Sequence, residues 1–120
     1  MTTLTSPIDL LAAVPFLIGY APENSLVLVG LRADEMSLAM RIDYPEDVDL
    51  DQIDTLANHL VKEKSDGALL VAYLPEEVMD AECLLTPLRE AIEMRDIKVR
   101  ECVVVSNGKW RSSKIGRAHV

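Results

Sequence analysis

Residues 6–30 read SPIDLLAAVPFLIGYAPENSLVLVG, and this stretch decides the fold. It begins as a helix, because Ser6 can cap the first turn and Pro7 at the first helical position loses no hydrogen bond. Apolar residues then recur at helical spacing as far as Pro15, which must kink or interrupt the helix. Gly19 suits the left-handed residue that ends such a turn. The first half of the stretch therefore predicts an N-terminal helix.

The second half predicts a loop followed by a buried strand. Residues 20–25 are rich in turn-forming types. Residues 26–29, Leu-Val-Leu-Val, show no polar alternation, which is typical of a strand covered on both faces. A polar loop held between two buried elements is a candidate binding site. The alternative is an ordered connector, which is the commoner use of such a loop. The candidate site residues of this loop are Tyr20, Glu23, Asn24 and Ser25.

Three further segments predict strands. Residues 38–42 alternate apolar and polar types, which predicts a strand with one wet face, near a sheet edge and antiparallel to the first strand. Residues 68–74 are apolar throughout and predict a fully buried strand. Residues 97–106 predict the last complete strand, with the apolar residues 102–105 as its buried centre. Asn107-Gly108 is a strong signal for a two-residue turn, after which a returning strand begins at Trp110 and is cut short.

Two amphipathic helices separate these strands. Asp49 followed by Gln52 resembles a capping box, and Gly67 is predicted to close the first of the two helices. The second runs from about residue 78 to 95, and Pro87 must kink it or restart it. We therefore predict an α/β fold with a mixed sheet of about four strands. Its order is an N-terminal helix, a β-hairpin and then α-β-α-β, with the helices packed on the sheet.

Composition limits the classes of function. The chain has 120 residues, enough for one domain, and a formal net charge of −8, which argues against nucleic-acid and membrane-surface binding. No apolar run reaches the roughly 20 residues of a membrane span, and no Lys or Arg precedes the apolar residues 14–18 as in a signal peptide. We therefore expect a cytoplasmic protein. Cys83 and Cys102 lack metal-ligand spacing and are predicted to be buried, reduced thiols.

The last seven residues are predicted to be a non-native tail. Residues 114–120 can be encoded by the start of a widely used short-read sequencing adapter, which suggests that the reading frame ran out of the gene. The predicted domain is then residues 1–113, truncated at its C-terminus. Without the tail the chain holds 10 basic and 20 acidic residues, so its acidic character increases.

Standard catalytic and metal-binding motifs are absent from the sequence. It has no dinucleotide-binding glycine motif, no phosphate loop, no His-Glu-x-x-His and no Gly-x-Ser-x-Gly. The acidic residues between 46 and 54 lack the glycine-centred loop and terminal glutamate of a known calcium loop, so we predict no metal. The catalytic residues and any cofactor stay unassigned.

The carboxyl ends of the predicted strands provide a second candidate site, because ligands of open α/β sheets usually bind there. Tyr73 and Trp110 could form an aromatic wall, with polar anchors beside it. If the first strand were parallel to the others, Gly30 and Arg32 would join the same edge. The alternative is that both aromatic residues lie at a boundary, with apolar bodies and wet tips. The candidate residues are Tyr73, Glu76, Ser106, Asn107 and Trp110.

The opening motif also carries a family resemblance. Pro7, Leu10 to Pro15, Leu17, Gly19-Tyr20, Pro22 and Ser25 to Val27 resemble the opening of an actinobacterial family known as domain of unknown function 4192. Residues 107–110 resemble the turn and tryptophan of the same family. The resemblance implies an α/β fold and an actinobacterial source, but no activity for any residue. Because members are usually longer, it also implies that this chain is an N-terminal fragment.

Two functions from different classes follow as expectations. The first is a non-catalytic module that binds a protein partner or a small ligand, with the opening loop or the returning strand as its surface. The second is a hydrolase- or transferase-like enzyme whose active site is completed by a missing C-terminal part, with Glu23 and Ser25 as the residues to test. His, Asp or Cys clusters beyond Trp110 in a longer sequence would favour the enzyme. The oligomeric state is left open.

Overall fold

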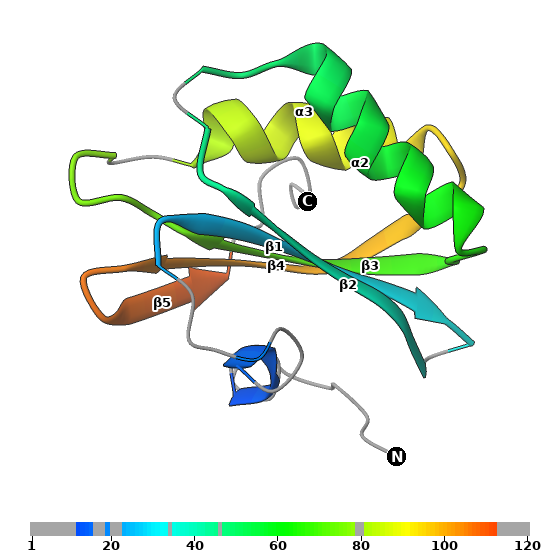
Figure 1. The fold of residues 1–120 in the computed structure, drawn as a ribbon, viewed down its shortest axis with the longest axis horizontal. Helices are drawn as coiled ribbons and strands as arrows, with labels where there is room; N and C mark the ends of the chain where they lie inside the picture. Colours follow the sequence, from blue (N-terminus) through cyan, green and yellow to red (C-terminus); the bar gives the residue numbers. More distant parts are fainter. Residues whose placement is uncertain are drawn as a thin grey trace, which may run out of the picture.

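The computed structural model describes residues 12–15, 19, 23–33, 35–45, 47–78 and 81–112. A five-stranded mixed sheet forms the centre, with helices on both of its faces (Figure 1). This confirms the α/β class, and the sheet has one strand more than predicted because the returning strand pairs with the end of its neighbour. The elements are β1 (Ser25–Arg32), β2 (Glu35–Asp43), α2 (Leu50–Lys62), β3 (Gly67–Tyr73), α3 (Glu82–Glu93), β4 (Lys98–Ser106) and β5 (Lys109–Ser112).

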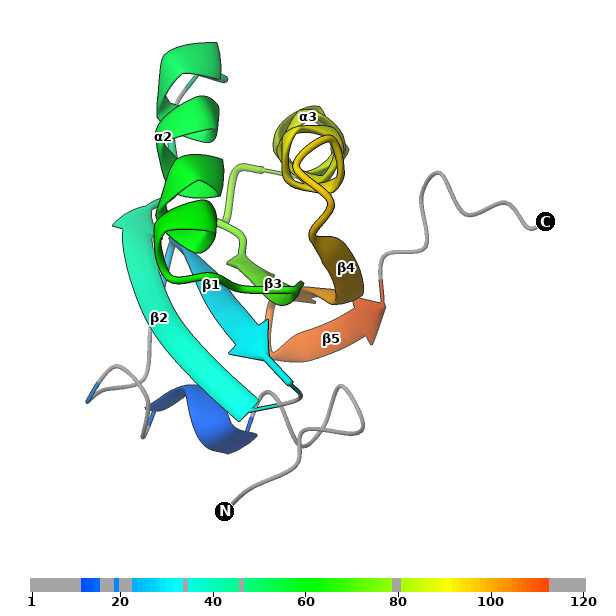
Figure 2. The same ribbon diagram turned by 90° about the vertical axis from the view of Figure 1, so that its right-hand side faces the viewer.

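The strand order is β2-β1-β3-β4-β5. β1 is antiparallel to both of its neighbours, β3 and β4 are parallel, and β5 is antiparallel to β4. β2, β3 and β4 therefore all run in one direction, and two crossovers connect them. The first crossover carries α2 past β1, and the second carries α3 between adjacent strands. Both helices cover the same face of the sheet, and helical residues 12–15 lie on the opposite face (Figures 1 and 2).

Alternate residues of the central strands build two separate cores. The face under α2 and α3 is covered by aliphatic side chains of both helices, including the fully buried Leu60, Leu85 and Leu88. The opposite face holds a smaller cluster that includes Val14 from the N-terminal helical residues. This arrangement explains why β1 and β3 read as uninterrupted apolar runs. The smaller cluster consists of Val14, Val27, Val29, Leu31, Leu69, Val71 and Val103.

The predicted start of α2 is confirmed, and its predicted end is wrong. Asp49 is the N-cap, and its Oδ1 accepts from the amides of Asp51 (2.9 Å) and Gln52 (3.4 Å). The helix ends at Lys62, well before Gly67, which instead begins β3. Lys64 takes the left-handed conformation (φ 58°) that reverses the chain after the helix. A non-glycine residue therefore fills the position expected of glycine.

α3 is shorter than predicted and runs through its proline. It begins at Glu82 instead of about residue 78, because Val78 closes a turn through its amide to the Pro75 carbonyl oxygen (3.0 Å). Pro87 lies inside the continuous helix, and no restart occurs there. The missing amide of a proline costs one backbone hydrogen bond. We attribute the intact helix to its apolar side, which is buried on the sheet both before and after Pro87.

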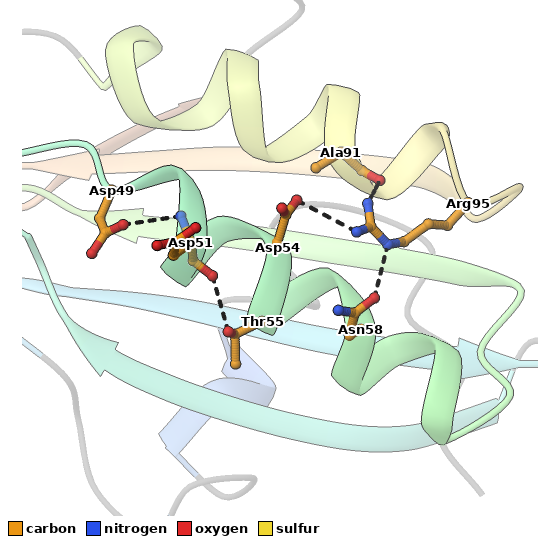
Figure 3. Close-up of polar contacts among 7 residues, drawn as sticks. All are labelled: Asp49, Asp51, Asp54, Thr55, Asn58, Ala91 and Arg95. Atoms are coloured by element: carbon orange, nitrogen blue, oxygen red, sulfur yellow. Dashed lines mark hydrogen bonds and ion pairs between the residues drawn. The ribbon is translucent and has the colours of Figure 1, made fainter.

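Arg95 lies just beyond the end of α3 and connects it to the middle of α2 (Figure 3). Its guanidinium donates to the Ala91 carbonyl oxygen of α3 (2.7 Å), to Asn58 Oδ1 (3.1 Å) and to Asp54 Oδ1 (3.4 Å) of α2. The planar fork of arginine allows these separate contacts, which a lysine could not reproduce. The contact satisfies one of the last carbonyls of α3 and fixes the position of α3 relative to α2.

The two cysteines differ, which corrects one expectation. Cys102 is buried in β4, but Cys83 in the first turn of α3 is exposed, and neither forms a disulfide. Along α3 the buried face is set by residues such as Leu84 and Leu88, and Cys83 lies outside it. Over the described parts of the chain, no helix has the length and apolar character needed to span a membrane.

Candidate functional site

One edge of the sheet brings together the separate candidate groups. We call it the carboxyl edge, because β2, β3 and β4 end there while β1 and β5 begin there. Successive register partners, one from each strand, form a row along it. The row consists of Asp43 of β2, Ser25 of β1, Tyr73 of β3, Val105 of β4 and Trp110 of β5.

The direction of β1 explains why these candidate residues lie at one edge. Because β1 is antiparallel to β3, its first residue pairs with the last residue of β3. The opening loop and the strand ends, predicted as two different sites, therefore share one edge. The same direction sends Gly30 and Arg32 to the opposite edge, so the suggestion that they join this site is wrong. The described candidates at the carboxyl edge are Glu23, Asn24, Ser25, Tyr73, Glu76, Ser106, Asn107 and Trp110, while Tyr20 lies outside the described residues.

The Ser25 hydroxyl is fully engaged in structural hydrogen bonds. Ser25 is 0% exposed, and its Oγ donates to the Glu23 carbonyl oxygen (2.6 Å) while accepting from Arg41 Nε (2.9 Å). The Arg41 guanidinium also contacts Asp43 Oδ1 at 2.8 Å. A serine nucleophile needs a base that removes its proton and open space for the attacked atom. Ser25 shows neither feature among the described residues, so its hydroxyl holds β1 to β2.

Other polar candidates shape the chain and leave their side chains exposed. Asn24 takes a left-handed conformation (φ 48°), and its carbonyl oxygen accepts from the Tyr44 amide (2.8 Å). Asn107 (φ 53°) and Gly108 (φ 75°) form the predicted two-residue turn, which requires positive φ at both positions. Glu76 is exposed beyond the end of β3. These residues fix the edge and present polar groups at its rim.

The two aromatic candidates lie on the same face but do not adjoin each other. Tyr73 and Trp110 both pair with Val105, one on each side of it, which separates their backbones by about 10 Å. Tyr73 is half-buried beside the smaller core cluster, whereas Trp110 is 43% exposed. Val105 therefore lies between Tyr73 and Trp110, and the two rings do not form the continuous aromatic wall that was expected. Burial raises the pKa of the Tyr73 phenol above its usual value of 10.0.

This raised pKa predicts a loss of stability in alkali. The unfolded chain releases the Tyr73 proton near pH 10, before the folded chain does, so unfolding becomes more favourable as the pH rises above about 10. We expect the urea midpoint to fall more between pH about 9 and about 11 in the parent protein than in Tyr73→Phe. Equal falls in both proteins would contradict the assignment of this effect to Tyr73.

A cavity lies at the carboxyl edge, on the face that carries α2 and α3. Its volume is about 310 Å³, close to the lower end of the range for small-molecule sites. Its walls come from the segment that leaves β2, the segment that leaves β3, and the first turn of α3. Most of the lining residues are apolar, and Glu77 and Cys83 are among the polar ones. The lining residues are Tyr44, Pro45, Val48, Pro75, Glu77, Val78, Cys83 and Leu84.

The topology explains the position of the cavity. β2 and β3 are parallel and each leads toward a helix, but β1 lies between them and runs the other way. The segments that lead from β2 to α2 and from β3 to α3 therefore leave the sheet on either side of β1, and the first residue of β1 lies between them. This position is the crevice outside the carboxyl ends of strands where α/β sheets usually bind ligands.

The described site residues predicted from the sequence lie at this edge, but none of them lines the cavity. No role in a site was predicted for residues 44–49, and Glu76 was chosen instead of its neighbour Glu77, which lines the cavity. The available signal was that residues 44–49 and 74–81 both lead from a strand into a helix. Equivalent connections from parallel strands gather at one edge.

The surroundings of the cavity are strongly acidic. In the sequence, residues 43–51 and 74–84 contain nine Asp or Glu and no Lys, Arg or His, and seven of these acidic residues belong to the described part of the chain. The N-terminal turns of both helices carry carboxylates, Asp51 in α2 and Glu82 in α3, which offset the positive ends of the helix dipoles. Clefts lined by one sign of charge concentrate ligands of the opposite sign. In the described ranges, no group of three or more His, Cys, Asp or Glu residues could hold a metal ion.

A comparison with protein families identifies the family of the chain. The model described as Domain of unknown function (DUF4192) matches residues 7–118. The chain belongs to this family. No protein with curated annotation matches the sequence. The DUF4192 assignment confirms the resemblance seen in the opening motif, and in this DUF4192 chain the matched region contains the whole carboxyl edge and its cavity.

Proposed function

We propose that this DUF4192 domain is a non-catalytic binding module that takes a small cationic ligand with an apolar body. The single observation that carries the proposal is the cavity at the carboxyl edge, which combines apolar walls with a carboxylate. Small-molecule sites are typically apolar cavities with a few polar groups that orient the ligand. Glu77 supplies a counter-charge, and the Tyr44 ring can contact a cation through its face.

The charge distribution supports a cation over an anion. Nine carboxylates and no basic residue lie in the two segments that lead into α2 and α3. Neither segment has a basic residue that would attract an anionic ligand, whereas the carboxylates would attract an amine. We place the module in the cytoplasm of a bacterium. Neither Cys83 nor Cys102 forms a disulfide, which is in keeping with a reducing compartment.

The enzyme hypothesis receives no support from its two test residues. The Ser25 hydroxyl is buried and engaged, and Glu23 contributes its backbone carbonyl oxygen to that contact. A reacting serine would need its hydroxyl available to a base and a substrate. The binding module is therefore the function that the carboxyl edge favours.

Cys83 gives a direct test of the binding proposal. It is exposed and lines the cavity, whereas Cys102 is 3% exposed and serves as an internal control within the folded chain. We expect 2-phenylethylamine to slow the alkylation of Cys83 by iodoacetamide, measured by mass spectrometry. The neutral 2-phenylethanol should protect less and the anionic phenylacetate least, because the three share one shape and differ in charge.

Matched variants assign the protection to the cavity. Val48→Trp fills a lining position, while Val61→Trp places the same bulk near the other end of α2. Protection should vanish in the first variant and persist in the second. Glu77→Gln should remove the preference for the amine. Failure of all three compounds to protect Cys83 would overturn the binding module. Equal protection by all three would overturn the cationic class.

A further inference from the structure

Among the described residues, β5 forms an exposed basic edge of the sheet. Within the described chain, β5 is the last strand in the sheet order, and only one of its sides is paired (Figure 2). Lys109, Trp110 and Arg111 are all exposed on this strand. Residues 107–112 contain two cations and no acidic residue, in a chain whose net charge is −8. The edge is therefore basic, whereas the net charge of the molecule is negative.

The side chains of β5 divide by face. Lys109 pairs with Ser106 and Arg111 pairs with Val104, so both cations lie on the face that carries the two long helices. Trp110 pairs with Val105 and lies on the opposite face. A strand added beside β5 would thus meet two positive charges on one face and an indole on the other.

We propose that the open edge of β5 binds an extended acidic segment of a partner protein as an additional strand. Main-chain hydrogen bonds to β5 supply the binding, as in other complexes formed by strand addition. The partner places acidic side chains at alternate positions opposite Lys109 and Arg111. It places an apolar side chain between them, opposite Trp110. The recognised pattern is therefore acidic, apolar, acidic.

Charge complementarity selects this occupant over a second copy of the chain. Opposite residues of an antiparallel pair share a face, so a symmetric pair of β5 edges must centre on one residue. Centring on Trp110 sets Lys109 opposite Arg111 of the other copy, and centring on either cation sets it opposite itself. Like charges directly opposite each other are destabilising. A lysine on an edge strand is a common device against self-pairing.

Charge also disfavours nucleic acid as the occupant. A nucleic acid could contact only two cations on β5, and the net charge of −8 on the protein would repel the rest of the phosphate backbone. A short acidic segment needs only the two contacts. The interaction should weaken with salt, because exposed charges are screened.

Trp110 reports occupancy directly, because it is the only tryptophan in the chain. We expect the capped peptide Glu-Val-Glu-Val-Glu to change its fluorescence, with an affinity that falls as salt rises. The peptide Glu-Pro-Glu-Pro-Glu has the same charge but lacks the central amides, and Lys-Val-Lys-Val-Lys reverses the charge. Both should bind at least about tenfold more weakly. Equal binding of the proline peptide would overturn strand addition.

A charge-reversed variant provides a second test, because a gain of binding to the lysine peptide cannot result from loss of the fold. Lys109→Glu/Arg111→Glu should lose at least about tenfold in affinity for the acidic peptide and gain binding of the lysine peptide. The matched control Lys62→Glu/Lys64→Glu makes the same charge change at the end of α2 and should leave both affinities unchanged. Loss of binding to both peptides in the reversed variant would contradict the proposal. The proposal would also be contradicted if the parent protein bound oligothymidylate more strongly than the acidic peptide. It would be contradicted as well if the parent protein sedimented as a dimer and the charge-reversed variant sedimented as a monomer.

Discussion

Leu70→Ala is expected to reduce the free energy of unfolding by about 2–5 kcal/mol. Leu70 lies in the middle of β3, between Leu28 of β1 and Cys102 of β4, and is 0% exposed. Its side chain belongs to the core beneath α2 and α3. Removing it leaves a cavity that the surrounding strands cannot close, so the loss exceeds the transfer free energy of the missing atoms. This is a large share of the roughly 5–15 kcal/mol that stabilises a typical domain.

Leu50→Ala provides the matched control. Leu50 begins α2 and is 67% exposed, so the same truncation should change the stability by less than about 0.5 kcal/mol. Urea denaturation followed by circular dichroism measures both variants. Similar losses in the two variants would mean that β3 is not the centre of the fold.

Gly30→Ala is expected to cost about 1–3 kcal/mol, because an added methyl group has no room. A Cβ at residue 30 would lie 2.5 Å from Ser65 Oγ and 2.9 Å from Leu60 Cδ2. Leu60 is fully buried, and Ser65 Oγ is held by a hydrogen bond to Ser37 Oγ (3.0 Å), so neither can move freely. Glycine at this position lets α2 and the segment after it approach β1 closely.

Gly67→Ala separates this crowding from the general effect of replacing a strand glycine. The nearest atom to its added Cβ would be Arg100 Nε at 3.2 Å, part of a long and flexible side chain. We expect a change within about 1 kcal/mol, since less backbone entropy in the unfolded chain offsets the tight contact. Adding Ser65→Ala to Gly30→Ala should recover part of the lost stability. Additive losses in that double variant would contradict the steric explanation.

Local signals in the sequence predicted the elements well. The Asp49 cap and the apolar stripe of α2 depend only on neighbouring residues, as does the turn at Asn107 and Gly108. The exposure of Cys83 was also readable. Buried positions such as Leu84 and Leu88 set the phase of α3, and Cys83 lies off that face.

The direction of β1 was not readable in the same way. An apolar strand buried on both faces looks the same whether it is parallel or antiparallel to its neighbour. Its direction is settled by the crossover that carries the chain from β2, past β1, to β3. The cavity depends on that same long-range arrangement, because its walls come from segments some 30 residues apart in the sequence, such as Tyr44 and Pro75. Sequence periodicity therefore predicted the edge of the sheet where the cavity lies, but not the residues that line the cavity.

The antiparallel placement of β1 beside β3 is the claim on which the carboxyl edge and its cavity rest. Backbone nuclear Overhauser contacts between the two strands, measured on the labelled protein, test it most directly. The account predicts contacts that join Leu26 to Ala72 and Gly30 to Ala68. Contacts that join Leu26 to Ala68 and Gly30 to Ala72 would show parallel strands and would contradict it.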